Sequence, residues 1–230
     1  MLIVSLIEFR GAKLRISVQN TNYFLVFYIF NCNFAVMETT IILVRHGETL
    51  DNARQIMQGQ TQGELNEKGR AQAQQVAERL AGEPLDAIVA SDLHRAIQTA
   101  EIIAAPHGMM VQTTALLRER DWGSFTGRFI PELRGEVWPD DIESEEALLE
   151  RARQFLIYMT ATYPGKRVVA VGHGIINKAI LAVYAQCPMR EVQRMMNAEV
   201  RVLTTTTERA SSAAAVAVAA STATTAATAE

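Results

Sequence analysis

The chain has 230 residues and a formal net charge of −3. This length allows one domain with a full hydrophobic core, and the weak negative charge argues against a general nucleic-acid-binding surface, so an anion site must be built locally. The two cysteines, Cys32 and Cys187, lie far apart and lack metal-ligand spacing. They argue against a structural disulfide or zinc site and favour a cytoplasmic protein.

Both ends of the chain differ in composition from its middle. Residues 1–37 form an atypical N-terminal extension, in which basic residues precede an aromatic run at residues 23–30. This is the order of a signal anchor, but the run is too short to span a bilayer and no cleavage site follows, so we expect no membrane association and favour Met37 as the start of the protein. Residues 204–230 are almost entirely Ala, Thr, Ser and Val, and we expect this tail to be disordered or to form a frayed helix.

The middle of the chain, residues 38–203, alternates apolar strands with amphipathic helices. The predicted buried strands are residues 40–44, 86–90 and 167–171. The predicted helices are residues 66–80 capped by Asn66, a helix capped by Ser91 or Asp92 and running to residue 104, a helix opened by Ser144, and residues 175–184. This alternation predicts an α/β fold, a three-layer α/β/α sandwich with a mainly parallel sheet.

Chemically active side chains follow each of the three predicted strands. The first strand runs into Arg45, His46 and Gly47, the second into a segment with Arg95, and the third into His173. Because the carboxyl ends of parallel strands meet at one edge of a sheet, we expect these side chains to share a pocket. Arginine forks, imidazoles and the amides at helix starts would bind phosphate there, and a deprotonated ring nitrogen can attack phosphorus. The residues thus predict a cationic site for phosphoryl transfer.

A leaving alkoxide needs a proton, and Glu119 is the candidate donor. It lies in residues 116–123, an apolar and aromatic segment in which a carboxyl group can act first as acid and then as base for water. Asp121 is a rival acid, and an ion pair of Glu119 with Arg118 or Arg120 is the structural alternative. No metal-binding or P-loop motif is present, so no metal or other cofactor is expected, and the arginines supply the positive charge instead.

Six motifs stand in a fixed order between residues 40 and 203. They are Arg45-His46-Gly47-Glu48-Thr49 with Asn52, Gln58-Gly59, Leu65-Asn66-Glu67-Lys68-Gly69, the run from Ser91 to Ala100, Glu119-Arg120-Asp121-Trp122-Gly123, and Val171-Gly172-His173-Gly174. Together they resemble the histidine phosphatase superfamily, the branch shared by cofactor-dependent phosphoglycerate mutases and broad-specificity phosphatases. One Arg-His-Gly would be weak evidence, whereas the full ordered set is specific and implies a phosphoglycerate mutase-like fold.

The resemblance also implies a role for individual residues. His46 would be the phosphorylated nucleophile and Glu119 the proton donor. The residues that it assigns to the phosphate pocket and to further substrate contacts are Arg45, Arg95, His173, Asn52, Gln58 and Gly59.

The segment from Gly127 to His173 departs from the mutases, which resemble this chain but carry a much longer insertion there. A short cap, with aromatic side chains as candidate lining, suits a small phosphorylated metabolite. The candidate lining residues are Trp122, Phe125, Phe129 and Trp138. We therefore expect a phosphatase for small organic phosphomonoesters, with a mutase and a non-catalytic phospholigand-binding protein as alternatives. The sequence leaves a homodimer open.

Overall fold

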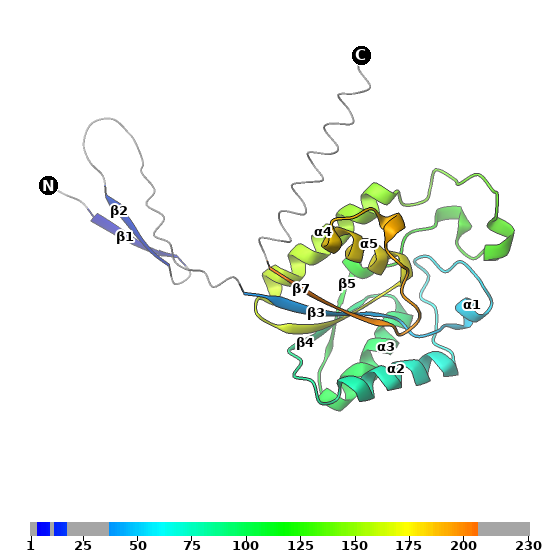
Figure 1. The fold of residues 1–230 in the computed structure, drawn as a ribbon, viewed down its shortest axis with the longest axis horizontal. Coiled ribbons are helices and arrows are strands. Elements are labelled where there is room, and N and C mark those ends of the chain that lie inside the picture. Colours follow the sequence, from blue (N-terminus) through cyan, green and yellow to red (C-terminus); the bar gives the residue numbers. More distant parts are fainter. Residues whose placement is uncertain (1–3, 10–11, 18–36, 207–230) are drawn as a thin grey trace, which may run out of the picture. The chain divides into compact units, whose positions relative to one another are not determined.

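A computed structural model describes residues 4–9, 12–17 and 37–206 (Figure 1). The chain divides into two compact units, Met1–Met37 and Glu38–Glu230. In the first unit, β1 (Val4–Phe9) and β2 (Ala12–Ser17) pair as antiparallel strands. The aromatic run at residues 23–30 and the tail beyond residue 206 lie outside the described residues, so the expectations for them stay predictions.

The second unit is built on a five-stranded sheet. Its strands, in order across the sheet, are β5 (Val111–Thr114), β4 (Ala87–Ser91), β6 (Arg167–Gly172), β3 (Thr39–Arg45) and β7 (Val200–Thr205). All neighbouring strands are parallel except β7, which runs antiparallel to β3. The three strands predicted from the sequence are confirmed, and they form the centre of the sheet. The predicted mainly parallel α/β architecture is confirmed with them.

Helices cover both faces of this sheet (Figure 1). The α-helices are α1 (Leu50–Ala53), α2 (Glu67–Leu80), α3 (His94–Ala104), α4 (Glu145–Thr162) and α5 (Gly174–Ala185). The short 3-10 helices are η1 (Ala105–His107), η2 (Ala115–Leu117), η3 (Gly123–Phe125), η4 (Ile130–Leu133) and η5 (Met189–Glu191). Helices α4 and α5 pack on one face, and α2 and α3 pack on the other.

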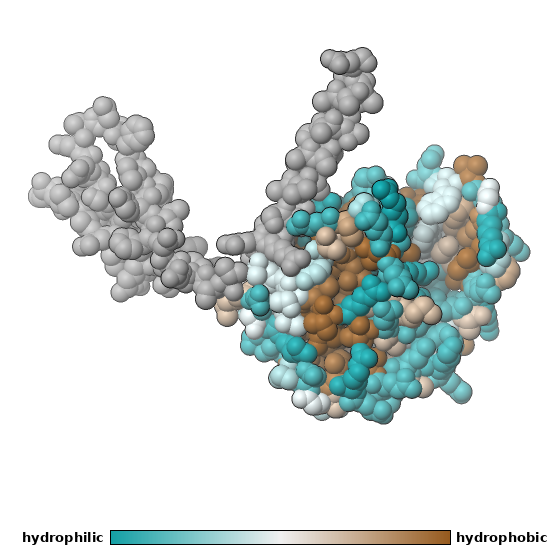
Figure 2. All heavy atoms as spheres, in the orientation of Figure 1, coloured by the Kyte–Doolittle hydropathy of each residue, from teal (hydrophilic) through white to brown (hydrophobic). Residues whose placement is uncertain are grey.

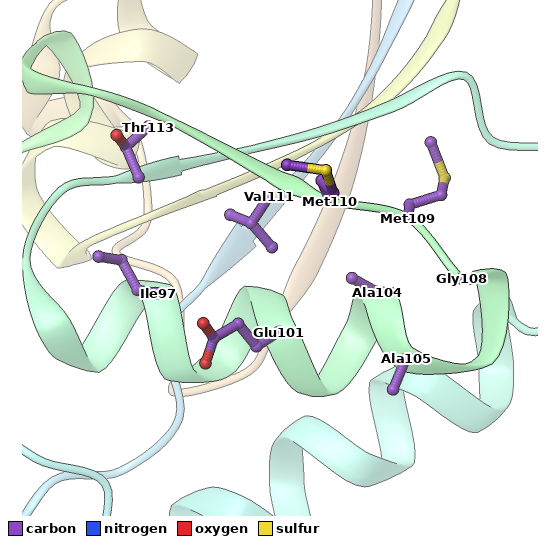
Figure 3. Close-up of a pocket in the computed structure, with 9 residues that line it drawn as sticks. All are labelled: Ile97, Glu101, Ala104, Ala105, Gly108, Met109, Met110, Val111 and Thr113. Carbon is purple, nitrogen blue, oxygen red and sulfur yellow. The ribbon is translucent and has the colours of Figure 1, made fainter.

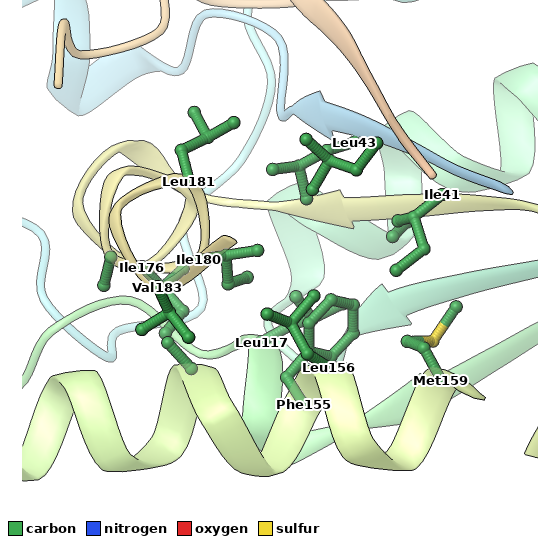
Figure 4. Packing of buried hydrophobic residues seen from close by; sticks show 14 of the residues in the cluster. Ile41, Leu43, Leu117, Phe155, Leu156, Met159, Ile176, Ile180, Leu181 and Val183 are labelled. Carbon is green, nitrogen blue, oxygen red and sulfur yellow. The ribbon is translucent and has the colours of Figure 1, made fainter. Parts of the chain in front are cut away.

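The two hydrophobic cores follow from the alternation of side chains along each strand. On β3, Ile41 and Leu43 point into the core under α4 and α5, where Phe155 and Ile180 meet them (Figure 4). The intervening Ile42 belongs to the core under α2 and α3. Because both faces are covered, β3 is buried on both sides, which is why the sequence shows a continuous apolar run there.

Two helix caps behave as expected and one does not. Asn66 and Ser144 accept a hydrogen bond from the backbone N–H three residues on, as N-caps do. The prediction of Ser91 or Asp92 as the cap of α3 is wrong, because the cap position is Leu93 and has no side-chain hydrogen bond. Asp92 is instead held by the guanidinium of Arg118, at 2.6 and 2.7 Å.

The sequence did not predict the edge strands β5 and β7. In β5 all four side chains are at least partly exposed, so the strand lacks an apolar run. At the other edge Val202 of β7 is 58 % exposed, and the space-filling view shows largely hydrophobic side chains around this strand (Figure 2). Within the described residues, no helix combines the length and the hydrophobicity needed to cross a membrane.

Candidate active site

The pairing of β3 with β6 brings the two predicted active-site histidines together. Arg45, the last residue of β3, lies opposite Gly172, the last residue of β6. The residue that follows each strand is a histidine, His46 after β3 and His173 after β6. The backbone N–H of His46 donates to the Gly172 carbonyl at 3.0 Å. The ring centroids of His46 and His173 lie 5.0 Å apart, and both rings are buried.

The two imidazoles have opposite hydrogen-bonding arrangements. Nδ1 of His46 lies 2.7 Å from the carbonyl oxygen of Gly47, which can only accept, so Nδ1 carries the proton and Nε2 bears a free lone pair. Nδ1 of His173 accepts from Nε of Arg95 at 3.1 Å, so its proton is on Nε2. This buried Nε2–H has no partner. One ring thus offers a nucleophilic nitrogen and the other a donor.

Burial and neighbouring cations keep both rings uncharged. For His46, desolvation is the first cause and the charges of Arg95 and Arg45 follow, and together they hold its pKa well below its ordinary value. Desolvation and Arg95 likewise hold the pKa of His173 well below its ordinary value. A neutral imidazole is the form that can attack phosphorus.

Arg95 organises the site with most of its donors. Four of its five N–H groups are used, by His173 Nδ1 and by the carbonyl oxygens of Gly59, Thr61 and Gln62. One N–H on Nη2 is left for a ligand, so the expected bidentate fork is wrong for this residue. Arg95 is only 1 % exposed, so it is not an ordinary surface arginine.

Arg45 leaves more of its N–H groups free for a ligand than Arg95 does. Its Nη1 donates to the carbonyl of Met195 at 2.8 Å, and its buried Nε has no partner. Burial first, and then the charge of Arg194, lower the pKa of Arg45 to about 10, which leaves it positively charged at neutral pH. Arg45 is therefore the arginine that can present a fork to phosphate oxygens.

Glu119 is buried beside the histidines, in a setting that differs from the apolar one expected. Its Oε1 accepts from the backbone N–H groups of Arg120, Ile175 and Ile176, at 2.9 to 3.1 Å. Its Oε2 has one contact, to the N–H of Ile175 at 3.2 Å, so this oxygen is the one free to exchange a proton with a ligand. No arginine forms a salt bridge with Glu119 among the described residues, and the rival Asp121 is exposed.

A cavity of about 40 Å³ lies above these groups. Its lining residues are Arg45, His46, Asn52, Ile56, Met57, Gln58, Gly59, Arg95, Glu119, Trp122, Ile130 and Arg194. The predicted site residues are thus brought together, with His173 buried just beneath Arg95. The side chain of Gln58 has a buried Oε1 without a partner, whereas Oδ1 of Asn52 already accepts from the N–H of Thr49.

Of the aromatic residues in the cap, one lines the cavity and another packs against it. Trp122 lines the cavity, and Trp138 packs edge-on against it with ring centroids 5.6 Å apart. The guanidinium of Arg120 lies 5.0 Å from the Trp122 ring centre and 5.2 Å from that of Trp138. Phe125 is buried in the cap and Phe129 lies outside the cavity, so the prediction of these two as lining residues is wrong.

The helix-start amides that we expected to bind an anion are already occupied. Those of Ile175 and Ile176 at the start of α5 donate to Glu119. At the start of α3, the N–H of His94 donates to the side chain of Gln62, and that of Arg95 to the Gln62 carbonyl. These four amides are therefore not available for an anion.

Three residues near the histidines were not predicted. The side-chain amide of Asn197 donates to the His46 carbonyl at 3.1 Å and to Asn52 at 3.3 Å. Thr99 accepts from the N–H of Gly47 at 3.1 Å, which ties this loop to α3. Arg194 lines the cavity from the connection before β7. Asn197 and Arg194 lie in a segment without a strand or helix pattern, so only their charge or polarity could have marked them.

A larger hollow elsewhere lacks the groups for phosphate chemistry. It has a volume of about 350 Å³ and lies between α3 and the edge strand β5 (Figure 3). Its lining is mostly aliphatic, and its one charged residue is Glu101. The described part of the chain holds no group of three or more His, Cys, Asp or Glu side chains that could bind a metal ion.

Comparison with known proteins identifies the family. Residues 41–216 match the model of the histidine phosphatase superfamily, branch 1. The chain is 37 % identical over 179 residues to phosphoglycerate mutase-like protein 4 of Arabidopsis thaliana, covering 70 % of this chain and 77 % of the relative. It is 36 % identical over 165 residues to the uncharacterized phosphatase PhoE of Bacillus subtilis, with 70 % and 85 % covered.

The solved structures give the same result. The native structure of a mycobacterial glucosyl-3-phosphoglycerate phosphatase superposes with a TM-score of 0.66 at 29 % identity, covering 73 % of this chain and 90 % of the other. The residues that match the family model, 41–216, include both histidines, both buried arginines and Glu119. The chain belongs to the histidine phosphatase superfamily, branch 1.

Proposed function

We propose that this protein is a metal-independent phosphatase that hydrolyses small organic phosphomonoesters through a phosphohistidine on His46. The observation that carries the proposal is the pair of opposed neutral imidazoles. His46 has a bare Nε2, and His173 has a free Nε2–H beside it. Because Arg45 and Arg95 add two positive charges, the pocket suits the dianion of a phosphomonoester.

In the first step, Nε2 of His46 attacks phosphorus and the bond to the ester oxygen breaks. The N–H groups of Arg45, Arg95 and His173 stabilise the negative charge on the equatorial oxygens. Oε2 of Glu119 gives its proton to the leaving alkoxide, which departs as an alcohol.

In the second step, the deprotonated Glu119 takes a proton from a water molecule. The resulting hydroxide attacks phosphorus, and the bond between phosphorus and Nε2 of His46 breaks. Inorganic phosphate leaves and the neutral imidazole is restored, so the cycle is balanced without any further reactant.

Hydrolysis is favoured over mutase transfer by the cap. A mutase must hold the alcohol while the phosphoryl group moves between its hydroxyls, which requires an enclosing cover. Between η4 and α4 this chain has only a short irregular segment, and Val137 within it is 91 % exposed. The relatives include proteins named as mutase-like and as phosphatases, so their names leave both activities open for this chain.

Phosphate release in the presence of EDTA, measured on a panel of small phosphomonoesters, tests the proposal. We expect release by the wild type and its loss, by at least about a thousandfold, in His46→Ala. The control is His94→Ala, because His94 is an exposed histidine of α3 outside the cavity. Interconversion of phosphoglycerates with little phosphate release would favour the mutase, and failure to form a phosphohistidine would favour a binding protein.

A further inference from the structure

An ion pair near the start of α4 has no role in the reaction as proposed so far. The guanidinium of Arg151 donates two hydrogen bonds to the carboxylate of Glu143, from Nε to Oε1 at 3.0 Å and from Nη2 to Oε2 at 2.7 Å. Both side chains are largely buried, with 17 % and 15 % of their surface exposed. Because the removal of two charges from water offsets much of their attraction, such a pair adds little to stability by itself.

Arg151 also donates to the backbone of the segment that carries Glu119. Its Nη1 donates to the carbonyl oxygens of Leu116 and Arg118, at 3.2 and 2.5 Å. Its Nη2 donates to the carbonyl oxygen of Glu119 at 3.4 Å. A single side chain of α4 therefore holds three carbonyl groups of this segment, and the planar guanidinium fixes their direction as well as their distance.

Glu143 binds the same segment on the other side of Glu119. Its Oε2 accepts from the backbone N–H of Asp121 at 3.1 Å, and its own backbone N–H donates to the Asp121 carbonyl at 3.0 Å. The backbone carbonyl of Glu143 accepts from Nε of Arg120 at 2.7 Å. Together, the two residues of the ion pair hold the chain immediately before and immediately after Glu119.

The carboxyl group of Glu119 depends on this backbone for its position. On its apolar side the segment is anchored by Leu117, which is buried in the core beneath α4 (Figure 4). On its polar side, Oε1 of Glu119 accepts from the N–H of Arg120, so a shift of residues 118–120 would move the proton-donating oxygen. Misplacing a catalytic group by about 1 Å can cost roughly a hundredfold in rate.

We propose that Arg151 and Glu143 are positioning residues that hold Glu119 where its Oε2 can transfer a proton. Neither of them lines the cavity, so both act through Glu119 and not through contact with the substrate. The inference rests on the proposed function, which makes Glu119 the acid for the leaving group. Loss of the pair should therefore slow the steps in which Glu119 moves a proton and spare those in which it does not.

Two esters of nearly the same shape separate this role from a general effect on folding. Nitrophenolate leaves p-nitrophenyl phosphate without a proton, whereas the alkoxide of p-nitrobenzyl phosphate needs one. The rate at which each ester phosphorylates His46 is measured in the first turnover by rapid quench. We expect Arg151→Gln to slow this step by about 10- to 100-fold with the benzyl ester and by less than about threefold with the phenyl ester.

A double-mutant cycle shows whether Arg151 acts through Glu119. Glu119→Gln alone should slow phosphorylation by the benzyl ester, and adding Arg151→Gln to it should slow the step by less than about twofold more. Glu143→Gln keeps an oxygen acceptor for the N–H of Asp121 but removes the charge, so it should show the same selectivity with a smaller loss of roughly 3- to 10-fold. This variant decides the question if Arg151→Gln does not fold.

The control is Arg153→Gln, because Arg153 lies two residues further along α4 and forms its ion pair with Glu150 of the same helix. It should leave both rates close to those of the wild type. Equal losses for the two esters, or a further large loss when Arg151→Gln is added to Glu119→Gln, would overturn the inference. If the wild type formed no phosphohistidine with either ester, the proposed function itself would fail, which is seen separately from a loss of selectivity.

Discussion

At the scale of single residues, the two histidines differ in what their Nδ1 atoms contact. A carbonyl oxygen fixes the proton on Nδ1 of His46, and an arginine N–H fixes the lone pair on Nδ1 of His173. The free Nε2 atoms consequently have opposite character. Identical side chains can serve as nucleophile and as donor because the backbone and Arg95 choose the tautomer of each.

Replacing Glu119 with Gln should separate the two chemical steps. With an aryl phosphate such as p-nitrophenyl phosphate, the leaving group needs no proton, so phosphorylation of His46 should remain fast. Hydrolysis of the phosphohistidine needs the base and should slow by about 10²- to 10⁴-fold. We expect a burst of one nitrophenolate per site in rapid-quench kinetics, followed by accumulation of the phosphoenzyme.

The matched control for this experiment is Asp121→Asn. Asp121 is two residues away but exposed, and it binds the N–H of Gly123 rather than facing the cavity. This variant should turn over at close to the wild-type rate without a burst. A burst in Asp121→Asn and none in Glu119→Gln would reverse the assignment of the acid.

At the scale of elements, helix α2 packs directly on the loop after β3 at two glycines. A Cβ atom on Gly69 would overlap the backbone carbonyl of Glu48 and lie 2.7 Å from its backbone nitrogen. One on Gly47 would overlap the Gly69 carbonyl. These neighbours are backbone atoms and cannot swing aside, so the loop that carries His46 is positioned by the close approach of the helix.

Gly69→Ala should therefore destabilise the protein by about 1–3 kcal/mol and lower activity, although Gly69 does not line the cavity. Gly82→Ala is the control, because a Cβ atom there meets nothing within 4 Å. It should change the free energy of unfolding by less than about 0.5 kcal/mol. Urea unfolding and phosphate release measure both effects, and equal stability of the two variants would contradict the packing argument.

The central strands were predictable because both of their faces are buried, which leaves a continuous apolar run. The edge strands were not, since β5 reads Val-Gln-Thr-Thr and its pairing with β4 depends on tertiary contacts. The cap of α3 failed for a similar reason, as Asp92 is drawn into an ion pair with Arg118, 26 residues away. The local capping preference of a residue determines its role only where no distant partner competes for its side chain.

The site residues that lie at strand ends or in the sequence motifs could be predicted. Arg45, His46 and His173 follow from the sheet, because strands in register deliver consecutive residues to one place. The near-complete use of Arg95 by backbone carbonyls did not follow, since those carbonyls belong to a loop without a pattern. Arg194 was missed because an exposed arginine outside any motif has no signal in a single sequence.

At the scale of the whole molecule, the buried neutral histidines couple folding to pH. Their folded-state pKa values lie below that of an unfolded histidine, near 6.5, so as the pH falls the unfolded chain takes up protons first. The free energy of unfolding should be greatest above about pH 6.5 and fall below it by about 1.4 kcal/mol per pH unit for each histidine.

Urea unfolding at several values between pH 5 and 7.5 measures this slope. We expect the double variant His46→Asn/His173→Asn to lose most of the decline between pH 6.5 and 5, because neither replacement titrates. Each protein is compared with its own stability at pH 7.5, which removes the effect of the substitutions on packing. The same slope in both proteins would show that other groups cause the decline.

The division of the cavity between rigid strand ends and connecting loops has a consequence for how such a protein can change. The atoms that handle phosphorus are fixed by the sheet, whereas Ile130 and Arg194 sit on connections that the sheet does not constrain. Substitutions or insertions in those connections could alter which molecule is admitted while leaving the bond-breaking step intact. The substrate specificity of this fold can thus change stepwise during evolution, while the catalytic residues stay the same.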